Sequence, residues 1–106
     1  SMPYQGAFVL NTERPLVPHV RAIEKAAHVL LATLGRTGSG VHAPGDFSLL
    51  LFPLPKIALL YVFYVADEEF PASVTCLCSN NARAFMPLDG LADTAEYTTR
   101  KILELL

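Results

Sequence analysis

The spacing of apolar residues predicts one helix in the first third of the chain and another at its end. In the first third, apolar residues recur at helical spacing and share one helix face: Val20, Ile23, Ala27, Leu30 and Leu34. Pro15 and Pro18 are compatible with the start of this helix, and Gly35 is typical of its end. A second stripe predicts a helix over Leu88–Leu106, after Pro87. Its inner positions are Leu91, Ala95, Thr98, Ile102 and Leu105.

Between these helices the apolar residues follow the patterns of β-strands. Phe47–Phe52 predicts a first strand, which Pro53–Pro55 ends. Ile57–Ala66 is apolar on both faces, so we expect a central strand with both faces buried. Ala72–Cys78 alternates and predicts a third strand, and Ala82–Met86 predicts a short edge strand.

The remaining segments are expected to be irregular. Residues 1–14 form a lead-in with a short strand at Ala7–Leu10, and the glycine-rich segment Gly35–Gly45 forms a loop. The order of elements predicts an α+β fold. We expect a three- to four-stranded antiparallel meander sheet, with the N-terminal and the C-terminal helix packed on one face. A length of 106 residues fits a single domain over 1–106.

Composition and charge exclude several classes of protein. Hydrophobic residues make up 52% of the chain and charged residues 17%, which predicts either a well-filled core or an apolar face that a partner covers. The net charge is −2 and the basic residues are scattered, which argues against nucleic-acid binding. The longest apolar run is about half of the ~20 residues that a membrane helix needs. Two cysteines do not make a disulfide scaffold, so we expect a cytoplasmic protein.

Three consecutive carboxylates, Asp67, Glu68 and Glu69, are the best candidates for a binding site. They could bind a cation or a basic partner, or raise one another's pKa for acid–base chemistry. The pattern favours a simpler interpretation, a solvated turn in which Asp67 bonds its own backbone. Lys56 is a further candidate for binding. It lies ~33 Å from the carboxylates along the predicted strand, too far for a direct ion pair.

The two cysteines are candidate metal ligands. Cys76 and Cys78 lie on one face of the predicted third strand, and His19 and His42 are the only obvious further ligands. Zinc sites usually show two spaced pairs of ligands, and a second cysteine pair is missing from the sequence. The spacing therefore favours small packing residues. We predict no metal and no cofactor bound directly to the chain.

Three segments of the second half resemble the family known as domain of unknown function 3786. They are LPKIALL at Leu54–Leu60, DEEFPAS at Asp67–Ser73 and MPLDGLA at Met86–Ala92. The first departs from the family pattern at Ala58, where a second proline is expected. Gly6–Phe8 and the first helix show a weaker resemblance to the middle part of the family's sequence.

The resemblance implies an accessory role rather than a defined activity. Members are typical of anaerobes, and some occur beside or fused to corrinoid and iron–sulfur proteins of one-carbon metabolism. A corrinoid would therefore reach this chain through a partner. Typical members are longer at the N-terminus, so we expect an upstream segment of the family to be missing here. The resemblance also makes Asp67–Glu69 the first site to consider.

Three hypotheses about function follow. The favoured one is a non-catalytic accessory or interaction module, with a protein partner or a second copy of the chain docked on the sheet. The alternative is a small-molecule-binding domain with a pocket between sheet and helices and the acidic turn at its mouth. The third is an enzyme that uses Asp67, Glu68 or Glu69 as a general base, although no nucleophile or cofactor motif accompanies them.

Overall fold

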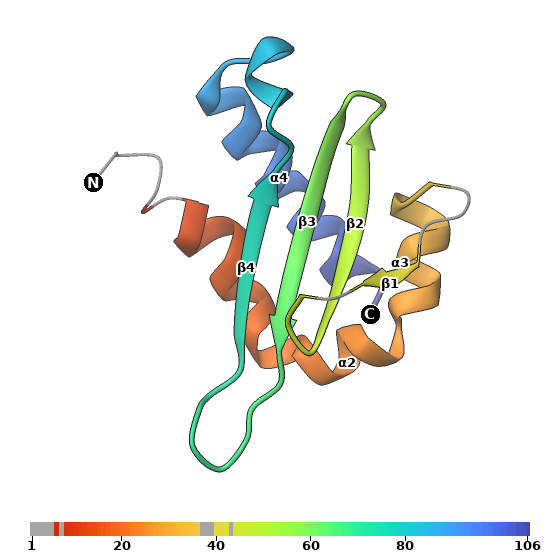
Figure 1. The fold of residues 1–106 in the computed structure, drawn as a ribbon, viewed down its shortest axis with the longest axis vertical. Helices are drawn as coiled ribbons and strands as arrows, with labels where there is room; N and C mark the ends of the chain where they lie inside the picture. The colour runs from red at the N-terminus through yellow and green to blue at the C-terminus, as the bar shows by residue number, and fades with distance from the viewer. Residues whose placement is uncertain (1–5, 7, 37–39, 43) are drawn as a thin grey trace.

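The chain forms an antiparallel sheet with helices on one face, in a computed structural model that describes residues 6, 8–36, 40–42 and 44–106 (Figure 1). The N-terminal helical elements are η1 (Val9–Glu13), η2 (Arg14–His19), α2 (Val20–Lys25) and α3 (Ala27–Leu34). The strands are β1 (Val41–His42), β2 (Phe47–Leu54), β3 (Ile57–Tyr64) and β4 (Ser73–Cys78). The chain continues through η3 (Ala82–Ala84) into α4 (Leu88–Glu104). The predicted α+β architecture is confirmed.

The N-terminal helical segment begins earlier than the sequence predicts. A strand at Ala7–Leu10 is wrong, because Phe8–Leu10 is helical; Ala7 itself lies outside the described residues. The buried stripe of the first helix extends upstream through Leu16 to Thr12, both fully buried. Thr12 is polar and adds nothing to the apolar periodicity, so that pattern alone predicts an irregular lead-in.

The sheet is a meander in the order β1–β2–β3–β4, and every neighbouring pair is antiparallel. Strand β1 has two residues and lies inside the segment predicted as a loop. Strand β2 continues through Pro53 to Leu54, with an irregular register between Leu51 and Leu54. Such an irregularity accommodates a proline, because proline has no N–H to donate to a neighbouring strand.

Strand β3 is central, but only one of its faces is fully buried. Leu59, Tyr61 and Phe63 point to the helix-covered face and have no exposed surface. On the other face Leu60 is half-buried and Tyr64 is exposed. Burial on both faces was therefore wrong for this strand, because the helices lie together behind the sheet in Figure 1.

The open face is closed at one point by the turn before β2. Gly45 has a φ of +76°, a conformation that favours glycine. An added Cβ there would lie 2.7 Å from the Val62 Cγ1 and 2.8 Å from the Phe63 carbonyl oxygen. This close approach helps to bury Val62, whereas Leu60 and Tyr64 on the same face of β3 keep exposed surface.

Helix α4 crosses behind the sheet with the predicted residues inward: Leu91, Ala95, Thr98 and Ile102 are buried. Thr99 is buried as well and was not predicted. The edge strand predicted at Ala82–Met86 is wrong. That segment turns helically, and the N–H groups of Phe85 and Met86 both donate to the Ala82 carbonyl oxygen.

Candidate functional site

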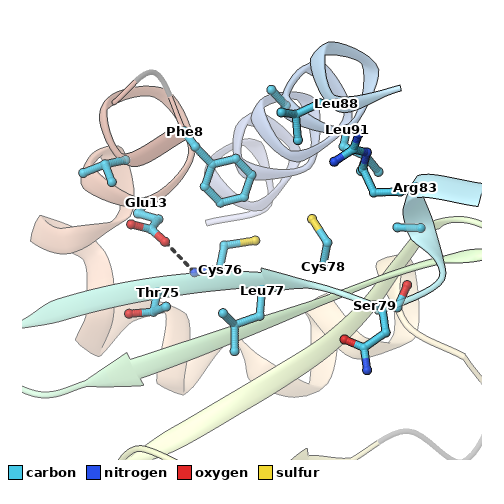
Figure 2. A pocket seen from close by; sticks show the side chains of 14 residues that line it. Phe8, Glu13, Thr75, Cys76, Leu77, Cys78, Ser79, Arg83, Leu88 and Leu91 are labelled. Carbon is cyan, nitrogen blue, oxygen red and sulfur yellow. Dashed lines mark hydrogen bonds between the residues drawn. The ribbon is translucent and has the colours of Figure 1, made fainter. Parts of the chain in front are cut away.

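A pocket of about 650 Å³ lies between β4, the N-terminal helical segment and the start of α4. Strand β4 contributes its last residues, and the two helical segments contribute mainly apolar side chains (Figure 2). The lining comprises Phe8, Val9, Glu13, Thr75, Cys76, Leu77, Cys78, Ser79, Asn80, Ala82, Arg83, Leu88, Leu91 and Ala92. Its volume falls within the range of small-molecule sites, roughly 300–1,000 Å³.

Two thiols form the floor of the pocket. Cys76 and Cys78 point from β4 toward Phe8 and helix α4, as the alternation of the strand predicts (Figure 2). Burial, reinforced by the nearby Cys78, raises the pKa of the Cys76 thiol well above its ordinary value. Burial also raises the pKa of the Cys78 thiol. Both side chains are thus protonated near neutral pH and offer neutral, weakly polar surface.

Glu13 fixes the N-terminal wall of the pocket against the edge of the sheet. One of its carboxylate oxygens accepts a hydrogen bond of 2.8 Å from the Cys76 backbone N–H. Strand β4 is the last strand of the sheet among the described residues, and there the side of its backbone away from β3 pairs with no other strand. The Glu13 carboxylate therefore accepts the hydrogen bond that a neighbouring strand would otherwise accept from the Cys76 N–H. This bond also anchors η1 beside the two thiols.

A buried chain of hydroxyl groups connects three elements of the core. The Tyr61 hydroxyl lies 2.9 Å from Thr99 Oγ1 and donates to the Ala95 carbonyl oxygen at 3.1 Å. The Thr99 hydroxyl in turn donates to the Thr12 carbonyl oxygen at 2.6 Å. Burial raises the pKa of the Tyr61 hydroxyl far above its ordinary value. Buried hydrogen bonds thereby link strand β3, helix α4 and η1.

The other end of the pocket is polar and basic. Arg83 lies on η3 with its side chain over the end of the pocket near Leu91, and Ser79 lies below it (Figure 2). The Arg83 side chain is exposed, and within the described part of the chain no carboxylate forms an ion pair with it. The pocket thus has Glu13 at one end, Arg83 at the other and apolar groups between.

The acidic turn lies at the opposite end of β4. The Asp67 carboxylate accepts hydrogen bonds from the backbone N–H groups of Glu69 and Phe70, at 2.8 and 2.7 Å. All three acidic residues are exposed. Asp67 thus bonds its own backbone, as the favoured interpretation of this turn predicted. A hollow of about 460 Å³ beside it is lined by Asp46, Tyr64, Val65, Asp67, Phe70, Pro71 and Ser73.

Lys56 lies in the tight turn between β2 and β3, at the end of the sheet away from the acidic residues (Figure 1). Its Nζ is 5.1 Å from the centroid of the Phe85 ring, just after η3. A cation at this distance is attracted to the face of an aromatic ring. The structure therefore separates Lys56 from the acidic turn and places it near the segment that carries Arg83.

The described residues contain no group of three or more His, Cys, Asp or Glu side chains that could hold a metal ion. His19 is exposed at the end of η2, and the His42 side chain lies outside the described part. No helix in the described ranges combines the length and the apolar character that crossing a membrane requires.

Comparison with known proteins gives one match. The model of the family described as "Domain of unknown function (DUF3786)" matches residues 1–101. The chain belongs to this family. The match extends the resemblance from the three motifs of the second half to the N-terminal helical segment, which forms one wall of the pocket. No curated protein and no solved structure matches the chain.

Few residues of the pocket could be predicted from the sequence. Its wall residues Phe8 and Glu13 fall in the segment predicted as an irregular lead-in, and Arg83 falls in the predicted edge strand. The cysteines were the one available signal, because two adjacent inward positions on an edge strand carry small polarisable side chains. Their spacing could not show that Phe8 and α4 face them across a cavity.

Proposed function

We propose that this domain is a non-catalytic binding protein that holds a small, largely apolar molecule in the pocket between β4, η1 and α4. The observation that carries the proposal is the pocket itself: a volume of about 650 Å³ with mostly apolar lining and a few polar groups at its two ends. This combination is typical of ligand sites, in which apolar walls provide affinity and polar groups fix orientation.

The chemistry of the floor supports binding rather than covalent catalysis. A thiol is nucleophilic as a thiolate, and the raised pKa values of Cys76 and Cys78 keep both groups protonated at neutral pH. Such thiols pack against carbon chains as small apolar groups do. Both cysteines are free, which fits the reducing cytoplasm that we propose as the location.

The test is a fragment titration monitored by amide NMR shifts. We expect apolar fragments to shift the signals of Cys76, Cys78 and Leu91. Ala92→Phe should abolish these shifts, because Ala92 lines the pocket and a phenyl ring would fill it. Ala32→Phe is the matched control, since Ala32 is exposed on α3 and does not line the pocket. Fragments that bind both variants equally, or that leave the pocket signals unchanged, would contradict the proposal.

A second candidate function is docking of a protein on the open face of the sheet. Leu77 is 50% exposed and lies opposite the half-buried Leu60 on the face away from the helices. Tyr64, which is 46% exposed, lies on the same face four residues farther along β3. Exposed apolar side chains that adjoin one another favour contact with another protein. For the partner we keep the corrinoid or iron–sulfur protein that the family resemblance implies, with a second copy of the chain as the alternative.

Co-elution with a purified corrinoid protein tests this second candidate. Leu77→Gln should weaken the complex, because it replaces an exposed apolar side chain of the open face, on the edge strand β4. Leu106→Gln is the control, since Leu106 is similarly exposed, at 45%, but lies at the C-terminus. Equal co-elution of both variants would count against the sheet face, and failure of the native chain to co-elute would count against a corrinoid protein as partner.

A further inference from the structure

We propose that the ligand of the pocket is a medium-chain carboxylate, with its carboxylate at Arg83 and its carbon chain over the two thiols toward Phe8. The inference rests on the proposed function and adds the chemical class and the orientation of the ligand. It follows from the unequal charges at the two ends of the pocket and from the apolar surface between them.

The basic end selects an anion. Arg83 lines the pocket, and within the described ranges its guanidinium has no carboxylate partner. A guanidinium presents parallel N–H donors that match the two oxygens of a carboxylate. Ser79 and Asn80 line the same end and add side chains that can donate hydrogen bonds. The end at Arg83 thus has the donors that a carboxylate requires.

The acidic end sets the orientation. Glu13 lies at the other end of the pocket in Figure 2, and one of its oxygens is occupied by the Cys76 N–H. A second negative charge near this carboxylate would be repelled, because like charges that share a poorly hydrated site destabilise each other. A ligand with one anionic group therefore places that group at Arg83, and a dicarboxylate that spans the pocket is disfavoured.

The middle of the pocket requires an apolar body. Phe8, Leu88 and Leu91 form the helical walls, and the protonated thiols form the floor. Burying a chain of methylene groups against these surfaces is favourable, by about 0.8 kcal/mol for each methylene removed from water. A short polar acid such as acetate gains little here, whereas an eight-carbon chain can contact both the thiols and Phe8.

Calorimetric titration with octanoate and 1-octanol tests the inference. We expect octanoate to bind the native chain more tightly than octanol does. Arg83→Gln should weaken octanoate binding about fivefold, the effect of one solvent-exposed ion pair, and should leave octanol binding unchanged. Arg21→Gln is the matched control: it removes the same charge from an exposed residue that pairs with Glu24 and does not line the pocket.

Protection of Cys78 locates the bound ligand. Cys78 is partly exposed within the pocket, so octanoate should slow its alkylation by N-ethylmaleimide in the native chain. Higher salt should weaken octanoate and leave octanol unaffected. Equal binding of octanoate and octanol, or equal binding of octanoate by Arg83→Gln and the native chain, would overturn the carboxylate inference and leave the proposed pocket standing. Loss of all fragment binding at the pocket would instead overturn the proposed function.

Discussion

The two ends of β4 are held by different kinds of contact. At the pocket end, residues far apart in the chain meet: Glu13 bonds Cys76, and Thr99 bonds Thr12. At the acidic turn, Asp67 bonds the backbone of residues two and three positions later. The first end is a cavity with walls from three elements, and the second is an exposed turn that stabilises its own backbone.

This difference shows why the cavity is the better candidate for function. A binding site needs groups whose positions are fixed before the ligand arrives, and long-range contacts between packed elements provide that. The three carboxylates of the acidic turn are exposed, so water competes for each of them. Four predictions sharpen the comparison, in order of decreasing expected effect.

The largest effect is expected from the pH dependence of stability at the pocket floor. Because burial raises the pKa of the Cys76 thiol, the folded chain holds that proton more tightly than the unfolded chain. The contribution of Cys76 is complete below pH 8.5, the ordinary thiol pKa, and falls above it by about 1.4 kcal/mol per pH unit. Denaturant unfolding should show a free energy of unfolding that falls as the pH rises above 8.5, with a smaller fall in Cys76→Ala. Identical slopes would contradict burial of this thiol.

The second effect concerns the hydroxyl chain beneath the pocket. Thr99→Val should cost about 1–2 kcal/mol of unfolding free energy, because it breaks the bonds to Thr12 and to the Tyr61 hydroxyl. Thr98→Val is a close control: Thr98 is equally buried, but its hydroxyl bonds only the Thr94 carbonyl oxygen of the same helix. Chemical denaturation should separate the two variants, and equal costs would count against the long-range chain.

A smaller effect is expected at the acidic turn. Asp67→Ala removes two accepted hydrogen bonds in an exposed turn and should cost about 1 kcal/mol. Thermal unfolding measures the cost, with Asp93→Ala as a control for loss of an exposed carboxylate on α4. Octanoate affinity should stay at the native value in both variants. A weaker affinity in Asp67→Ala alone would show that the turn contributes to the ligand site.

The smallest effect is expected from the remaining two acidic residues. Glu68→Gln combined with Glu69→Gln should change the unfolding free energy by less than about 0.5 kcal/mol, because both side chains are exposed. Octanoate affinity, measured by calorimetry, should also be unchanged. A loss of affinity well beyond that of Asp67→Ala would restore the acidic turn as the principal binding site.

The local parts of the fold were predictable from the sequence, and the long-range parts were not. The stripe from Leu91 to Ile102 and the alternation from Val74 to Cys78 are periodic patterns, so the helix and the strand followed directly. The turn at Asp67 has a local signature and was also predicted. Strand β1 has two residues, which is too short for a recognisable pattern, and it forms by pairing with β2.

Of the candidate site, only the floor formed by Cys76 and Cys78 could be predicted from the sequence. The sequence places both thiols on one face of a strand, but it does not place Phe8 opposite them or Arg83 at their side. Glu13 is one polar residue in a mixed segment, and its role depends on where η1 docks. The acidic triplet is apparent in the sequence because its charges are consecutive, whereas a pocket between three elements depends on how those elements pack.

The position of bound octanoate is the most direct test of whether function resides at the pocket end of β4. Isotope-filtered NMR measures nuclear Overhauser effects between the octanoate chain and nearby protein protons. We predict contacts to the ring of Phe8 and to the side chain of Leu91, on opposite walls of the pocket. Contacts to Phe70 and Tyr64, beside the acidic turn, would contradict the account.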